Sequence, residues 1–126
     1  MNKPKEKLKK FLTENGIVET SKITGLPYSR IIQEFNLGYK TFDDIEFKPH
    51  PLGNGVQGVI TFDNGYGASI VQTKTSYGGR EGLYELAILD KFGQLMYTTQ
   101  ISDDVIGYLT PEQVTEKLIQ IQDLKK

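Results

Sequence analysis

The sequence contains no cysteine, a single histidine and no long apolar run. Without cysteine the chain can form neither a disulfide nor a thiolate zinc site, which excludes a small secreted scaffold held together by disulfides. The lysine-rich residues 1–10 lack the apolar run of a signal peptide, and no stretch approaches the roughly 20 apolar residues of a membrane span. We therefore expect a cytoplasmic protein that makes no contact with a membrane.

The formal net charge of -1 conceals an uneven distribution along the 126 residues. Residues 1–40 contain seven lysines and Arg30 against four glutamates, a net charge of +4. The remainder contains six lysines and Arg80 against twelve acids, a net charge of -5. If the chain contacts nucleic acid, we expect the basic first part to make that contact. The alternative is that its lysines only solvate one face of a helix.

The first 37 residues are predicted to form a helix-turn-helix-like segment. Residues 4–14 are predicted to form an amphipathic helix, because apolar side chains recur at helical spacing among the lysines, and Asn15-Gly16 is expected to end it. A second short helix is predicted over residues 19–24, and a third begins at Leu26-Pro27. Gly25 lies between the last two helices, where this motif has its tight turn.

A helix-turn-helix that reads DNA exposes side chains of its last helix to base edges and phosphates. The candidates on or near the expected exposed face are Lys22, Tyr28, Ser29, Arg30 and Gln33. Three other positions count against DNA reading, because Thr20, Thr24 and Glu34 stand where such motifs are usually apolar. Protein docking is the alternative role for this segment.

The second part of the chain is predicted to be a sheet. Alternating apolar residues predict four antiparallel strands, over residues 56–62, 68–73, 83–89 and 94–100. Asn64-Gly65 between the first two strands is a strong hairpin signal, and as a two-residue turn it would place Val59 opposite Ile70. The preceding residues 38–55 are rich in glycine and proline and are expected to be a linker.

A helix is predicted over residues 110–124, with Thr110 as its N-cap, Pro111 in its first turn and Gln113 completing a capping box. Its expected buried stripe is Val114, Leu118 and Ile121. We therefore predict an α+β fold, in which residues 56–126 form a four-stranded antiparallel meander covered by a C-terminal helix.

No group of residues indicates catalysis, a metal site or a cofactor. Residues 53–59 spell G-x-G-x-x-G-x-V, but a strand is expected after them where a dinucleotide site needs a helix. The sequence contains no cysteine and no second histidine that could form a nucleophilic catalytic group with His50. The pairs Asp43-Asp44 and Asp103-Asp104 lack the spacing of a calcium loop. We therefore predict that the protein is not an enzyme.

The loop over residues 73–82 is the candidate site on the second part of the chain. It is longer than a hairpin needs, and tyrosine and arginine on a glycine-rich loop are typical of interface hot spots. The predicted partner-binding residues are Lys74, Tyr77, Arg80 and Glu81. The alternative is a solvent-exposed connection without a partner.

Four short segments together resemble a small domain of uncharacterised bacteriophage proteins. They are Phe62 to Gly67, Ser76 to Gly79, Gly82 to Ala87 and Asp103 to Tyr108, within residues 41–122. The resemblance implies a phage accessory protein in the cytoplasm of a host bacterium, analogous to anti-CRISPR proteins. The hypothesis is a non-enzymatic inhibitor that occludes a host protein, such as a CRISPR nuclease or another defence effector. The alternative is a DNA-binding transcriptional regulator, and the sequence indicates no oligomeric state.

Overall fold

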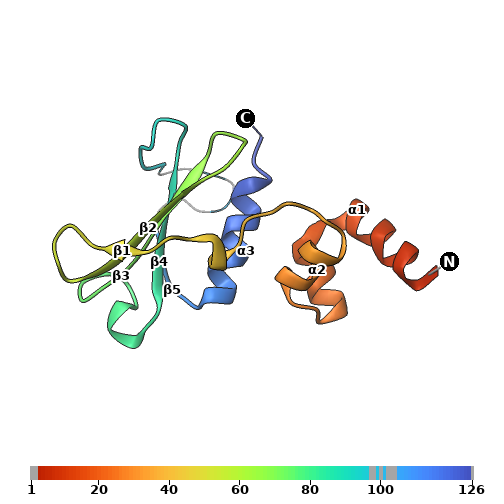
Figure 1. The fold of residues 1–126 in the computed structure, drawn as a ribbon, viewed down its shortest axis with the longest axis horizontal. Coiled ribbons are helices and arrows are strands. Elements are labelled where there is room, and N and C mark those ends of the chain that lie inside the picture. The colour runs from red at the N-terminus through yellow and green to blue at the C-terminus, as the bar shows by residue number, and fades with distance from the viewer. Residues whose placement is uncertain (1–2, 97–98, 100, 102–104, 126) are drawn as a thin grey trace. The chain divides into compact units, whose positions relative to one another are not determined.

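The computed structural model describes residues 3–96, 99, 101 and 105–125. The chain divides between Tyr39 and Lys40 into two compact units, which we call the helical unit and the sheet unit. Figure 1 shows the helices of the first and the antiparallel sheet of the second. Among the described residues, no helix is long and apolar enough to cross a membrane. The α+β class is thus confirmed, with a long N-terminal helix, an antiparallel sheet and a C-terminal helix.

The helical unit consists of α1 (Lys3–Thr24) and α2 (Tyr28–Glu34). Gly16, with φ 87° and ψ 171°, breaks α1 at the point where the first predicted helix was expected to end. A left-handed φ of 73° at Gly25 then accompanies the end of α1, and the N–H of Gly25 donates to the Ser21 carbonyl at 2.8 Å. Glycine is favoured at both positions because positive φ strains residues that carry a Cβ.

Thr20 is fully buried although its side chain is polar. Its hydroxyl donates to the Gly16 carbonyl at 2.7 Å, so the buried oxygen has a partner. This bond explains how a threonine occupies a position that is usually apolar in a helix-turn-helix. The motif itself stays a prediction.

Over the described residues the sheet has five antiparallel strands in sequence order, so the prediction of four strands was wrong. The strands are β1 (Lys48–Pro49), β2 (Gly55–Thr61), β3 (Gly67–Thr73), β4 (Tyr84–Leu89) and β5 (Ile106–Leu109). The 3-10 turns η1 (Phe42–Asp44) and η2 (Gly79–Glu81) complete the unit with α3 (Pro111–Gln122). The expected linker over residues 38–55 therefore contains η1 and β1, and its Ile45 belongs to the hydrophobic core.

The two unpredicted strands are short edge strands. β1 has only two residues and includes Pro49. Proline has no N–H to donate to a neighbouring strand, so sheets accept it mainly in edge strands. β5 takes the place beside β4 that was expected for residues 94–100, with Ile106 opposite Leu86. In that predicted strand Leu95 forms a single bridge to Leu89, and residues 97, 98 and 100 lie outside the described part.

The β2–β3 hairpin is shifted by one residue from the predicted register, because Gly58 rather than Val59 lies opposite Ile70. The N–H of Phe62 donates to the Tyr66 carbonyl at 2.8 Å, and the N–H of Gly65 donates to the Phe62 carbonyl at 3.0 Å. These bonds close a three-residue loop with Gly65 at φ 93°, which is a common hairpin geometry.

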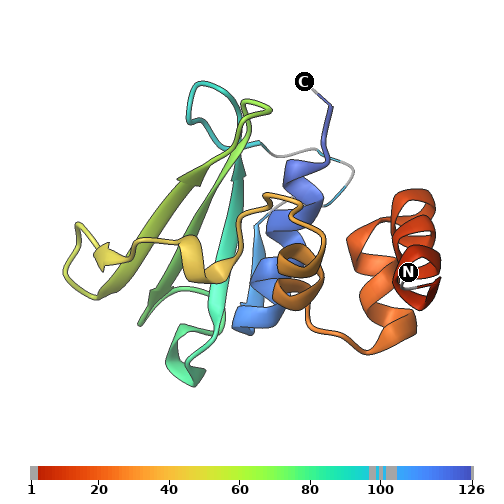
Figure 2. The ribbon, with the colours of Figure 1, turned by 45° about the vertical axis from the view of Figure 1, so that its right-hand side comes forward.

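One face of the sheet carries the core and is covered by α3 (Figure 2). The capping box predicted at Thr110 is confirmed, since its hydroxyl accepts the Gln113 N–H at 3.2 Å. The predicted stripe of Val114, Leu118 and Ile121 is buried against Ile70 and Leu86 of the sheet. Burial of these apolar side chains is the main source of stability for the unit.

The other end of α3 is held by the β2–β3 hairpin. The side-chain amide of Asn64 donates to the carbonyls of Ile121 at 2.8 Å, Gln122 at 3.2 Å and Leu124 at 3.0 Å. The last carbonyls of a helix have no partner within the helix. Asn64 therefore fixes both the helix end and the hairpin loop.

Candidate functional site

The loop over residues 73–82 joins β3 to β4 and is held in one conformation by its own hydrogen bonds. The Thr73 hydroxyl accepts the N–H groups of Thr75 at 3.2 Å and Ser76 at 3.0 Å. The Ser76 hydroxyl accepts the Thr73 N–H at 2.9 Å and donates to the Thr73 carbonyl at 3.1 Å. Left-handed glycines flank η2, with φ 89° at Gly78 and φ 77° at Gly82.

Glycines also allow this loop to pack closely against its surroundings. A Cβ at Gly79 would collide with the Thr73 carbonyl oxygen, and a Cβ at Gly107 in β5 would collide with the Cβ of Tyr77. Backbone collisions of this kind are expensive to relieve, because protein interiors are close-packed. The loop and β5 are therefore a single packed piece of structure.

Tyr108 in β5 joins the predicted loop residues at this site. Its N–H donates to the Tyr77 carbonyl at 3.1 Å, and both tyrosine side chains remain 59% exposed. Tyr108 has a φ of 58°, which is uncommon for a residue with a side chain and is often associated with function. Sequence reasoning missed Tyr108, because only the pairing of β5 with β4 brings it beside the loop.

The predicted residues Lys74, Tyr77, Arg80 and Glu81 are all exposed. The Arg80 side chain is partly fixed, since its Nε donates to the Lys74 carbonyl at 3.0 Å. We call these four residues together with Tyr108 the loop surface. It presents two aromatic rings, two cations and one carboxylate on a backbone that is already ordered.

In the helical unit, Lys22, Ser29, Arg30 and Gln33 are exposed as expected. Tyr28 is buried instead, with 8% exposure, which corrects the prediction that it lies on the exposed face of α2. The reason is helical spacing, because Tyr28 precedes Ile31 and Ile32 by three and four residues and shares their buried face.

Glu34 occupies another position that is usually apolar in a helix-turn-helix. Its carboxylate lies 3.3 Å from the Lys5 amine, and both side chains are about half exposed. An exposed pair of this kind contributes little to stability. Glu34 is therefore an exposed residue paired with Lys5, where a helix-turn-helix usually has a buried apolar residue.

Two of the residues considered for catalysis or metal binding, His50 and Asp44, accept hydrogen bonds within local turns. The Nδ1 atom of His50 accepts the Leu52 N–H at 3.1 Å within a turn, and the Asp44 carboxylate accepts the Thr41 N–H at 2.8 Å as part of the cap of η1. Within the described ranges, no three histidine or carboxylate side chains gather to hold a metal ion. Asp103-Asp104 lies outside those ranges.

The glycine motif over residues 53–59 leads into β2 and lies at no helix N-terminus. A Cβ at Gly58 would collide with Ile45, and a Cβ at Gly55 would collide with the Gln72 carbonyl. These two glycines therefore allow close packing of neighbouring segments, which is a sufficient reason for their presence.

Comparisons of the chain with models of known protein families, with curated proteins and with solved structures found no match. The resemblance to bacteriophage proteins accordingly stays a prediction.

Proposed function

We propose that this chain is a non-enzymatic protein-binding protein that docks its partner on the loop surface. The single observation that carries the proposal is the pair of half-exposed tyrosines, Tyr77 and Tyr108, fixed to each other by a backbone hydrogen bond. Tyrosine and arginine are enriched among the residues that dominate binding energy at protein interfaces.

Preorganisation strengthens this interpretation. Ordering a mobile loop on binding costs conformational entropy, which reduces the affinity that its contacts can deliver. The hydrogen bonds of Thr73 and Ser76 and the close packing at Gly79 and Gly107 order the loop before any partner arrives. Two tyrosine rings on this ordered backbone then offer a large contact area at low entropic cost.

The finer form of the proposal is inhibition by occlusion. The partner would be a host protein that binds nucleic acid, such as a CRISPR nuclease or another defence effector in a bacterial cytoplasm. The support for this partner class is electrostatic, because residues 41–126 carry a net charge of -5. A net negative charge attracts the unit as a whole to the basic groove with which such proteins bind nucleic acid, whereas the loop surface itself carries two cations and one carboxylate.

Photo-crosslinking in cells tests this proposal. A benzophenone amino acid at position 77 is compared with the same residue at position 92, since Tyr77 and Phe92 are both exposed aromatic side chains. We expect one protein to be joined covalently from position 77 and not from position 92. The same products from both positions, or none from position 77, would contradict docking at the loop surface.

DNA binding by the helical unit is the second candidate. Lys22, Arg30 and Gln33 are exposed around the turn at Gly25, and the positive φ of Gly25 suits the tight turn of a helix-turn-helix. Basic and amide side chains near such a turn are suited to contact phosphates and base edges.

For this second candidate, the double substitution Lys22→Ala and Arg30→Ala is expected to change the salt dependence of DNA binding. Each lost phosphate contact lowers the slope of log affinity against log salt by about 1, so the double variant should lose about 2. Fluorescence anisotropy with duplex DNA at several salt concentrations measures the slope. The control is Lys48→Ala with Lys117→Ala in the sheet unit, and equal slopes for both double variants would exclude Lys22 and Arg30 as phosphate contacts.

A further inference from the structure

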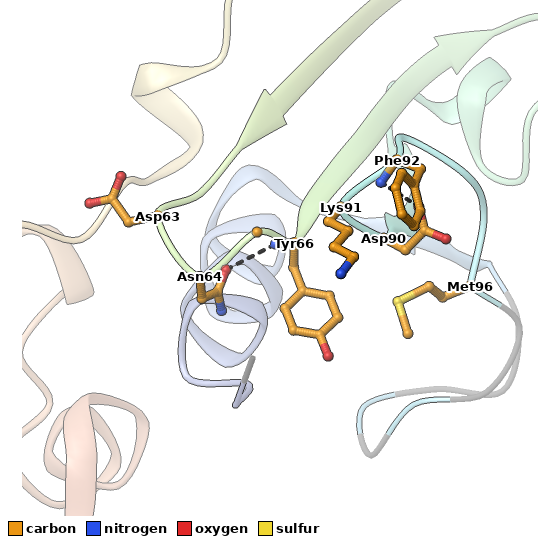
Figure 3. Close-up of a pocket in the computed structure, with 8 residues that line it drawn as sticks. Asp63, Asn64, Tyr66, Asp90, Lys91, Phe92 and Met96 are labelled. Carbon is orange, nitrogen blue, oxygen red and sulfur yellow. Dashed lines mark hydrogen bonds between the residues drawn. The ribbon is translucent and has the colours of Figure 1, made fainter.

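A pocket with a volume of about 590 Å³ lies at the end of the sheet opposite the loop surface. It opens between the β2–β3 loop and the turn that follows β4, and Figure 3 shows the side chains that line it. Its principal side chains are Tyr66, Lys91, Phe92 and Met96. The volume is within the range of small-molecule sites, which is roughly 300–1,000 Å³.

Both walls of the pocket are fixed by hydrogen bonds. Asn64 ties the β2–β3 loop to the end of α3, and its Oδ1 accepts the Tyr66 N–H at 3.1 Å. On the other wall, Oδ1 of Asp90 accepts the N–H groups of Phe92 at 2.8 Å and Gln94 at 2.9 Å. The two walls approach closely, because a Cβ at Gly65 would lie 3.6 Å from the Cβ of Lys91.

The lining is aromatic and apolar, with one cation, Lys91, and two carboxylates, Asp63 and Asp90. The Lys91 amine lies 5.3 Å from the centre of the Phe92 ring, and in Figure 3 it points into the space beside the Tyr66 hydroxyl and Met96. The Asp63 carboxylate points away from this space in the same view. Oδ1 of Asp90 accepts two N–H groups of the turn, and Lys91 is the cation of the lining, with its amine directed into the pocket in Figure 3.

We propose that this pocket binds a small aromatic anion. The ring of the ligand packs against Tyr66 and Met96, and its carboxylate or similar group lies beside the Lys91 amine. Aromatic and thioether side chains favour a flat ring through dispersion contacts, and the cation selects the sign of the charge. The site is independent of the loop surface, because β3 and β4 place the two at opposite ends of the sheet.

A charge series on one ring tests this site, with benzoate, benzyl alcohol and benzylamine as probes in NMR titrations. For ligands of this size we expect dissociation constants of about 1 mM or weaker. Benzoate is expected to bind tightest and benzylamine weakest, with saturable shifts at the amides of residues 64–66 and 91–96 that the structure describes. Tighter binding of benzylamine, or no saturable benzoate shifts at these amides, would overturn the proposal.

The substitution Lys91→Gln is expected to weaken benzoate binding about fivefold, the size of one ion pair in a solvent-exposed setting, and to leave benzyl alcohol unaffected. Lys48→Gln removes the same charge from exposed β1 and should leave benzoate binding unchanged. If both variants weaken benzoate equally, the attraction is a general effect of charge and the pocket is not an anion site. If neither variant weakens it, Lys91 does not select the ligand and the proposal also fails.

Discussion

Replacing Asn64 with aspartate is expected to lower the free energy of unfolding of the sheet unit by about 3 kcal/mol. Asn64 donates its side-chain amide to three carbonyls at the end of α3. Aspartate keeps the oxygen that accepts the Tyr66 N–H but replaces the donor with a second acceptor. The three carbonyls then lose this donor, while the Ile121 carbonyl keeps the Leu124 N–H at 3.1 Å, and they face a negative charge at the negative end of the helix dipole.

Urea denaturation followed by circular dichroism measures this effect. Asn64→Ala removes the hydrogen bonds without adding charge, so a smaller loss of about 1–2 kcal/mol is expected. Gln94→Glu makes the same amide-to-carboxylate change at an exposed turn residue and serves as the matched control. If the Asn64→Asp variant has the same free energy of unfolding as the Gln94→Glu variant, the Asn64 cap on α3 contributes nothing to stability.

The role of Asn64 also illustrates what the sequence could predict. Asn64-Gly65 correctly marks a hairpin, because both residues favour turns. The register differs by one residue, since the loop contains Asp63 as well and closes between Phe62 and Tyr66. A local pattern cannot report the contact of Asn64 with α3, because those residues are 57 to 60 positions away.

Some strands could likewise be predicted from the sequence, and others could not. β2, β3 and β4 are long enough for alternation to show, and the capped helix after Thr110 was predicted by its local signals. β1 and β5 have two and four residues, too few for a period-two pattern, and they are strands because a neighbour supplies hydrogen bonds. Tertiary pairing rather than propensity decides such short segments.

The candidate site was predicted only in part. Tyrosine, arginine and glycine in one long connection identified the loop over residues 73–82, but Tyr108 comes from a strand that the sequence did not predict. The exposed face of α2 was predicted except for Tyr28, where helical spacing places the ring with the buried isoleucines. For Tyr108 the missing information was the pairing of β5 with β4, and for Tyr28 it was which side of α2 faces the interior.

The second large effect is expected at the loop surface. Substituting Tyr77→Ala and Tyr108→Ala together should weaken binding of the partner identified by crosslinking at least about a hundredfold. The reason is that the two rings are large exposed side chains of the loop surface, and their backbones are joined by a hydrogen bond before binding. Isothermal titration calorimetry with the purified partner measures the change.

Phe92→Ala is the control for this experiment, because it removes an exposed ring of the same unit at the opposite end of the sheet. Its affinity for the partner should equal that of the unchanged protein. Circular dichroism must show that the double variant retains its helix and sheet content. A folded double variant with undiminished affinity would exclude the two tyrosines as the docking residues.

Hydrogen–deuterium exchange of the protein alone and in complex with that partner tests the central claim most directly. The claim is that a preordered loop surface docks the partner. It predicts that the hydrogen-bonded amides of the loop and of β5 exchange slowly even in the free protein and more slowly still in the complex. These are the amides of Lys74, Thr75, Ser76, Gly79, Glu81, Gly82 and Tyr108. Protection confined to the helical unit, or rapid exchange throughout residues 74–82 in the free protein, would contradict it.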